Sequence, residues 1–246
     1  MTAALDTKPR TSALDRDTAL RLAETEYQRV VALFEGLSAQ DWAKPTDCPA
    51  WDVRAMAAHM LGMAEMSASM RESMRQVKAA EKRGGVFIDA LTALQVVERA
   101  DMSPTAIAAR YAEVAPRAVK GRRRTPWFVR RQKMGATQAI NGHDEAWTLG
   151  FLIDVIMTRD PWMHRVDISH ATGAPLVLTA DHDGVLVDDV VREWATRHGR
   201  PFTLRLTGPA GGTWGEGGPE LEFDAVEFCR ALSGRGTAPL DTEVPF

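Results

Sequence analysis

The sequence is poor in cysteine and has no long apolar run, and both absences narrow the class of protein. Its 246 residues include only two cysteines, Cys48 and Cys229, which form no CxxC pair. Neither a disulfide framework nor a thiolate zinc site is therefore expected. No stretch approaches the roughly 18 to 20 uncharged apolar residues that span a bilayer, and the N-terminal segment lacks the apolar core of a secretory signal. We expect a cytoplasmic protein with no membrane partner.

The chain also lacks a large excess of charge of either sign. Its 30 basic and 33 acidic residues leave a net charge of −3. An acidic molecule has no electrostatic attraction to nucleic acid, so we expect no nucleic-acid partner. A hydrophobic share of 45% is enough to fill an ordinary globular core.

The spacing of apolar residues changes along the chain, and this change predicts the fold. Apolar residues recur at spacings of three and four in four predicted helices, over 14–36, from 52 to about 84, from 104 onward and over about 144–172. After Gly173, shorter segments predict an extended piece, two strands and two helices, over 175–179, 202–207, 220–223, 181–198 and 224–232. The sequence therefore predicts a mainly α fold, with a disordered tail (1–13), a helical bundle (14–173) and a small α+β domain (174–246).

A histidine on an apolar helix face is the first candidate for chemistry. His59 follows Met56 by three residues and precedes Met63 by four, so its ring needs polar partners in the core. Asp160 and His164 are four residues apart and project from one face of the predicted fourth helix. Two imidazoles and one carboxylate suit zinc and leave coordination positions open. Helical bundles build metal sites in this way, from side chains on facing helices.

Each of these residues also has a structural interpretation. His59 could be a hydrogen-bonded core residue. Pro161 follows Asp160, so Asp160 could be the N-cap of a helix that restarts at Pro161. Asp167 could hold the His164 imidazole through its second nitrogen, or it could pair with an arginine.

Basic residues near the candidate site could position an acidic substrate or a thiol cofactor. Arg71 on the predicted second helix and Arg165 beside His164 are the candidates, with a solvated helix face as the alternative for each. The solvated face is favoured for Arg159. The basic run over 120–133 predicts a solvated loop between helices, with an anion-binding loop as the alternative.

Three segments resemble the mycothiol-dependent maleylpyruvate isomerase family. They are 45–54 (PTDCPAWDVR) with Ala58-His59 after it, 158–168 (TRDPWMHRVDI), and the ending 242–246 (TEVPF) with Gly234-Arg235 before it. The resemblance extends over nearly the whole chain. It implies a DinB-like four-helix bundle followed by a small α+β domain similar to sterol-carrier proteins.

The resemblance also implies a divalent metal, usually zinc, held by His59, Asp160 and His164. The best-known member has Glu where this chain has Asp160, and the shorter side chain allows monodentate or water-bridged ligation. In this family, mycothiol adds to the cis double bond of maleylpyruvate. Rotation about the resulting single bond and loss of the thiol then give fumarylpyruvate.

We therefore expect an enzyme that depends on a metal and on mycothiol, a low-molecular-weight thiol, and acts on a small-molecule electrophile. It would be a cis–trans isomerase or a thiol S-transferase. Arg71 and Asp167 are the predicted catalytic residues, and Arg71 and Arg165 the predicted cofactor-binding residues. The alternatives are a non-catalytic small-ligand-binding module with a structural or vestigial metal site, and a metal-free helical protein.

Overall fold

Packing divides the chain into two compact units, each built from separate stretches of sequence. The structure, a computed structural model, describes residues 8–236, 240 and 242–246. Unit 1 contains 8–16, 126–156 and the described residues from 178 onward, and unit 2 contains 17–125 and 157–177. The predicted boundary between domains at 173 and 174 stays a prediction.

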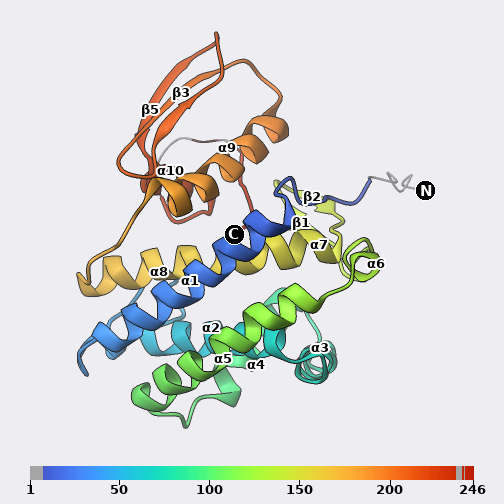
Figure 1. Ribbon diagram of the computed structural model, residues 1–246, viewed down its shortest axis with the longest axis vertical. Helices are drawn as coiled ribbons and strands as arrows, with labels where there is room; N and C mark the ends of the chain where they lie inside the picture. Colours follow the sequence, from blue (N-terminus) through green and yellow to red (C-terminus); the bar gives the residue numbers. More distant parts are fainter. Residues whose placement is uncertain (1–7, 237–239, 241) are drawn as a thin grey trace. The chain divides into compact units, whose positions relative to one another are not determined.

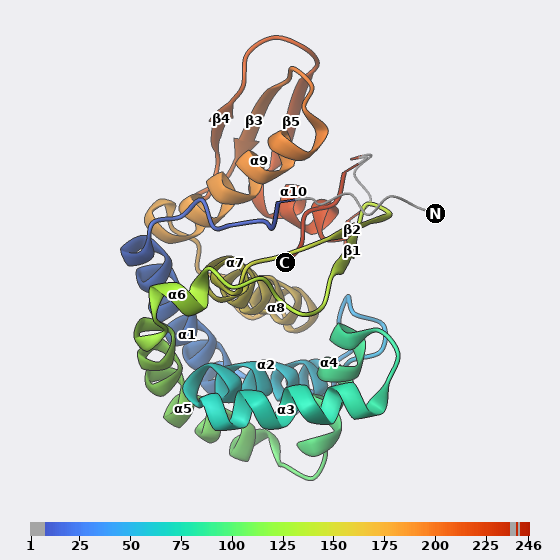
Figure 2. The ribbon, with the colours of Figure 1, turned by 90° about the vertical axis from the view of Figure 1, so that its right-hand side faces the viewer.

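Unit 2 is a helical bundle. Four of its helices run alongside one another in Figures 1 and 2, namely α1 (Arg16–Gly36), α2 (Val53–Ala68), α5 (Pro104–Arg124) and α8 (Met157–Thr172). Three shorter elements complete the unit, namely the 3-10 turn η1 (Asp41–Ala43), α3 (Met70–Arg83) and α4 (Phe87–Glu98). Both α3 and α4 lie against α2. The predicted four-helix bundle is thus extended by two helices, of which α4 was not predicted.

Side-chain caps explain where the helices begin. Asp52 is the predicted N-cap of α2, and its carboxylate accepts a hydrogen bond from the Ala55 N–H at 2.7 Å. The predicted second helix is wrong in one respect, because it is two helices. Ser69 takes an extended conformation, ends α2, and caps α3 by accepting from the Glu72 N–H at 3.3 Å. The predicted end at Gly84 is confirmed, since its positive φ of 71° breaks the helix.

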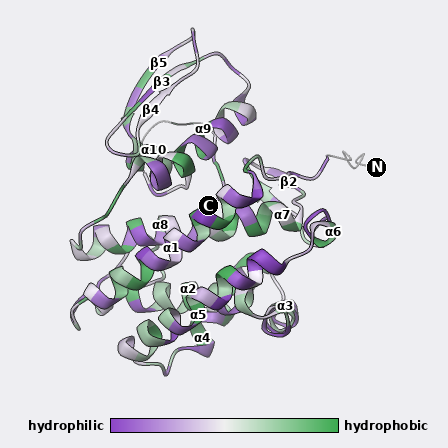
Figure 3. Cartoon of the chain, viewed as in Figure 1, coloured by the Kyte–Doolittle hydropathy of each residue, from purple (hydrophilic) through white to green (hydrophobic). Residues whose placement is uncertain are grey.

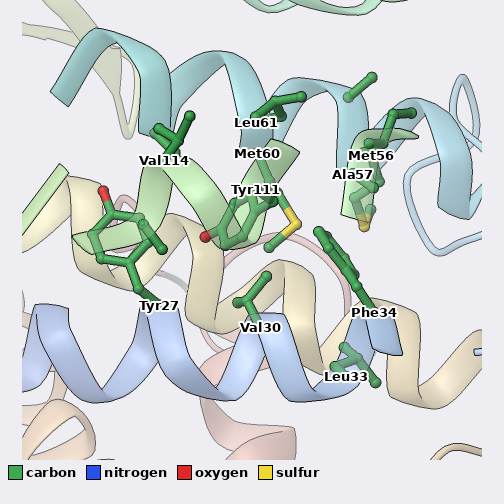
Figure 4. Packing of buried hydrophobic residues seen from close by; sticks show 14 of the residues in the cluster. Tyr27, Val30, Leu33, Phe34, Met56, Ala57, Met60, Leu61, Tyr111 and Val114 are labelled. Atoms are coloured by element: carbon green, nitrogen blue, oxygen red, sulfur yellow. The ribbon is translucent and has the colours of Figure 1, made fainter. Parts of the chain in front are cut away.

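The core of unit 2 is filled by apolar side chains from α1, α2 and α5. Figure 4 shows them directed toward one another, with Tyr27, Val30, Leu33 and Phe34 from α1, Met56, Ala57, Met60 and Leu61 from α2, and Tyr111 and Val114 from α5. The backbones of α2 and α5 touch at Gly121, where an added Cβ would overlap the carbonyl oxygen of Ser67. The basic run predicted as a loop begins within α5, and Arg122 is buried there. In Figure 3 hydrophilic colour gathers at this end of α5.

Unit 1 carries the strands and the remaining helices. Its main sheet has the order β4-β3-β5, in which β3 (Thr203–Thr207) pairs antiparallel with β4 (Gly212–Trp214) and parallel with β5 (Glu220–Asp224). Two helices were predicted here and are present, α9 (Val185–His198) and α10 (Ala225–Leu232). The other elements are β1 (Gln138–Ile140), β2 (His143–Glu145), α6 (Trp127–Arg130), α7 (Leu149–Phe151) and the π-helical segments η2 (Leu152–Ile156) and η3 (Ala180–Gly184).

One predicted boundary in this part of the chain is wrong. The fourth helix was expected from about Asp144, but Asp144 lies in β2. The helical stretch begins after Thr148, whose side chain accepts a hydrogen bond from the Phe151 N–H at 3.1 Å. The residues predicted as an extended piece, 175–179, lie in neither a helix nor a strand, and Thr179 is extended.

Residues 1–7 of the predicted disordered tail, 1–13, lie outside the described residues. Farther on, the backbone N–H of Arg10 donates to the Ala146 carbonyl at 2.8 Å. The Arg10 guanidinium also donates twice to the Glu145 carboxylate, at 2.9 Å. Arg10 therefore departs from the prediction of disorder, because β2 and the residues after it hold it.

The predicted fold class is confirmed, since the protein is mainly α with a helical bundle and a small α+β part. Within the described ranges, no helix has the length and apolar character needed to cross a membrane.

Candidate metal centre

The two predicted histidines and the aspartate between them meet inside unit 2. Nε2 of His59 on α2 lies 3.3 Å from Oδ1 of Asp160 on α8. Nε2 of His164, one turn after Asp160, lies 3.4 Å from the same oxygen. Potential ligand atoms from the three residues all lie within 4.8 Å of one another. The structure thus brings together the predicted set, whose role as metal ligands stays a prediction.

A buried arginine supports the turn of α8 that carries Asp160. Pro161 has no N–H, so the Met157 carbonyl, four residues earlier, lacks its helical partner. Arg122 of α5 donates to this carbonyl at 3.1 Å and to the Thr158 hydroxyl at 2.6 Å. Because α8 begins at Met157 and continues through Pro161, no helix restarts there, and the alternative N-cap role of Asp160 is wrong.

The outer nitrogen of each imidazole is hydrogen-bonded away from the centre. Nδ1 of His59 lies 2.7 Å from Oε1 of Gln95, and Nδ1 of His164 lies 3.1 Å from Oδ2 of Asp167. Asp167 therefore makes the contact with His164 that was one of its two predicted alternatives. With both Nδ1 atoms engaged, both Nε2 atoms face Asp160, where a cation could accept their lone pairs.

The charges at the centre reinforce one another. Burial acts to raise the pKa of Asp160, but the two adjacent imidazoles outweigh burial and hold this pKa well below its usual range. Burial acts to lower the pKa of His164, but Asp160 and then Asp167 outweigh it and raise the pKa to about 9. The carboxylate between the two rings is therefore ionised at neutral pH.

One atom of the centre has unmet bonding capacity. Oδ2 of Asp160 is buried and has no hydrogen-bond partner among the described residues. Leaving an ionised oxygen unsatisfied is costly, and coordination of a cation would satisfy it. Together with two imidazole nitrogens, the Asp160 carboxylate gives a donor set that fits a divalent metal such as zinc.

Two residues near the centre were not predicted to function in it. The half-buried indole of Trp51 lies 5.1 Å from the His59 ring and 5.9 Å from the His164 ring, between centroids. Sγ of Cys48 lies 4.0 Å from Oδ2 of Asp167. Both belong to the loop over 45–54, where family resemblance was the only signal in the sequence that placed them near His59.

The predicted arginines lie in different environments. Arg71 is exposed at the start of α3 and makes no hydrogen bond or ion pair within the described ranges. The buried Arg165 donates to both carboxylate oxygens of Glu26, at 2.8 and 3.2 Å, and to the Val177 carbonyl at 3.0 Å. The solvated position favoured for Arg159 is wrong, because its side chain is buried. The structure therefore joins neither Arg71 nor Arg165 to the three converging residues by a described contact.

Comparison with known proteins identifies similar sequences and structures. The profile of the family described as "Mycothiol maleylpyruvate isomerase N-terminal domain" matches residues 23–169, more than half of the chain. No curated protein matches. The crystal structure of the mycothiol-dependent maleylpyruvate isomerase is similar over 94% of this chain and 95% of that one, with a TM-score of 0.59 and 15% identity. A histidine-to-alanine mutant of that isomerase matches with the same coverage, a TM-score of 0.56 and 14% identity. At these identities the structural likeness shows the fold, which is DinB-like with a small α+β part.

Proposed function

Because this chain belongs to the family of the mycothiol maleylpyruvate isomerase N-terminal domain, we propose that it is a metal- and mycothiol-dependent enzyme acting on a small electrophile. The observation that carries the proposal is the approach of two imidazole Nε2 atoms to one carboxylate oxygen, at 3.3 and 3.4 Å. The buried, unsatisfied Oδ2 of Asp160 supports it further.

His59, Asp160 and His164 would hold the cation. When bound, a divalent cation lowers the pKa of a coordinated thiol and so favours the thiolate, which is the reactive form. Asp167 orients the His164 ring through Nδ1. Trp51 lies beside both rings, where its indole would limit the access of water.

The proposed reaction is thiol-assisted cis–trans isomerisation. The thiolate sulfur would add to one carbon of the double bond, the adjacent carbon would carry the charge as an enolate, and the bond between them would become single. After rotation, the double bond would re-form and expel the sulfur, which regenerates the thiol. In the S-transferase alternative, the sulfur would remain attached to the product.

The predicted roles of the charged residues are part of the proposal. Asp167 would act through its contact with His164. Of the two arginines, Arg71 has an exposed guanidinium that could bind an acidic ligand, whereas that of Arg165 is held by Glu26.

The test combines metal analysis with a panel of thiols. Purified protein should contain or bind zinc or another divalent metal, and metal-loaded protein should convert electrophilic acids with mycothiol but not with glutathione or bacillithiol. His164→Ala should lose both the metal and the activity. His170→Ala is the matched control, because this exposed histidine on the same helix contacts Asp47 instead of the centre. Activity that survives His164→Ala would contradict the proposal. A bound metal without thiol-dependent turnover would favour the non-catalytic binding module.

A further inference from the structure

A line of hydrogen bonds leads from His59 through two buried glutamines to a glutamate at the surface. We propose that this relay fixes the tautomer of His59, so that Gln95 is a positioning residue of the metal centre. The inference rests on the proposed function, because it takes His59 to be a metal ligand.

The relay consists of three consecutive short contacts. Oε1 of Gln95 lies 2.7 Å from Nδ1 of His59. Nε2 of Gln95 donates to Oε1 of Gln76 at 2.9 Å, and Nε2 of Gln76 donates to Oε1 of Glu72 at 2.9 Å. Both glutamines are fully buried, so water cannot replace their partners.

The far end of the relay determines the orientation of each amide. Nε2 of Gln76 faces the Glu72 carboxylate and also the Gly62 carbonyl, at 3.3 Å. Both are acceptors. A carbonyl oxygen can only accept, and the Glu72 carboxylate is ionised, because hydrogen bonds from Arg75 hold its pKa at about 2 against the effect of burial. The Gln76 amide nitrogen must face these acceptors, because its oxygen would meet only other oxygens there.

This orientation is transmitted to the histidine one contact at a time. Because the amide oxygen of Gln76 faces Gln95, Gln95 must present its nitrogen, and its own oxygen then faces Nδ1 of His59. An amide oxygen can only accept, so Nδ1 must carry the hydrogen. Nε2 is then left with a lone pair on the side of Asp160, which is the form of imidazole that binds a metal.

The packing of α2 makes room for this contact. Gly62 lies three residues after His59, and an added Cβ there would lie 2.6 Å from Cγ of Gln95. Any side chain at position 62 would therefore displace Gln95 from the imidazole. The two histidines also differ in their outer partners, because His164 has the carboxylate of Asp167 whereas His59 has a neutral amide.

The first test is ¹⁵N NMR of the zinc-loaded wild-type protein. The expected spectrum has a proton on Nδ1 of His59 and a metal-shifted Nε2. Coordination of zinc through Nδ1 of His59 would overturn the positioning role alone. Failure of the wild-type protein to bind zinc would overturn the proposed function, and the positioning role with it.

The second test measures zinc affinity by competition with a chelator. Gln95→Met keeps the side-chain volume but removes the acceptor, and it should weaken zinc binding by about 10- to 100-fold, as for loss of other outer partners of ligating histidines. Gln28→Met, the same change at an exposed site on α1, is the matched control and should bind zinc as the wild type does.

A double variant separates positioning from a general effect on packing. Q95E/E72Q moves the carboxylate next to His59. The Gln76 amide can then turn over and bond to the side chains at 95 and 72, with loss of its 3.3 Å bond to the Gly62 carbonyl. The acceptor for Nδ1 is retained, so most of the affinity lost in Gln95→Met should return. Unchanged affinity in Gln95→Met with an intact fold would contradict the proposal, as would equal losses in Gln95→Met and the double variant.

Discussion

Removing either partner of the buried Glu26–Arg165 ion pair should destabilise the protein strongly. Both side chains are almost fully buried, at 1% and 3% exposure, and two guanidinium N–H groups meet two carboxylate oxygens. Breaking such a pair leaves one charge buried without compensation, which costs about 3–5 kcal/mol. We therefore expect Glu26→Met and Arg165→Met each to lower the free energy of unfolding by about this amount. In a chain of this size, a loss of about 3–5 kcal/mol corresponds to a Tm lowered by roughly 6–20 °C.

The assay is urea unfolding followed by circular dichroism, with the double variant E26M/R165M completing a thermodynamic cycle. The double variant should be more stable than either single variant, because apolar side chains of similar volume often replace a buried ion pair at little cost. The reasoning would be refuted if Arg165→Met left the unfolding free energy unchanged and selectively weakened mycothiol binding. That result would establish the cofactor-binding role predicted for Arg165 from the sequence.

Two further predictions concern other parts of the fold. Gly121→Ala should destabilise the bundle by about 1–3 kcal/mol in chemical unfolding, since the added Cβ would overlap the Ser67 carbonyl and force α2 and α5 apart. An unchanged midpoint of the unfolding transition would contradict this close contact. Burial acts to raise the pKa of Glu145, but hydrogen bonds from Arg10 and Arg197 outweigh burial and lower this pKa from 4.5 to about 2. This group therefore contributes stability above about pH 4.5 that is lost as the pH falls toward 2. Glu145→Gln should be less stable than wild type at pH 7, with the difference shrinking across that window in pH-dependent thermal unfolding; a constant difference would contradict it.

The features that could be predicted from the sequence depend on residues close to one another in the chain. Asp52 caps α2 at the predicted residue, because one side chain placed just before a periodic segment determines its start. The helix predicted from 104 onward begins at Pro104. His59 could be located on an inner helix face because methionines three and four residues away share that face. Asp160 and His164 share a face through their own spacing, and so the convergence of the three could be anticipated.

The features that the sequence did not predict depend on partners far away in the chain. Apolar residues occur on all sides of α4, so no stripe predicted a helix there, and no role was predicted for Gln95. Glu26 lies 139 residues from Arg165, and nothing in the local sequence of either indicates the other. Arg122 and Arg159 were expected to be solvated because arginine usually is, and burial of each becomes apparent only from the packing of α5 and α8.

The two units share one chain that passes back and forth between them, and this determines when each can be completed during synthesis. The bundle of unit 2 lacks α8 until residues 157–177 have been made, by which time the 126–156 stretch of unit 1 has already been translated. That earlier stretch must in turn await residues from 178 onward before its own unit can close. The residues of neither unit are translated as one continuous block, so neither unit can finish folding before the other has been partly made. We therefore expect the final packing of both units to follow late in synthesis.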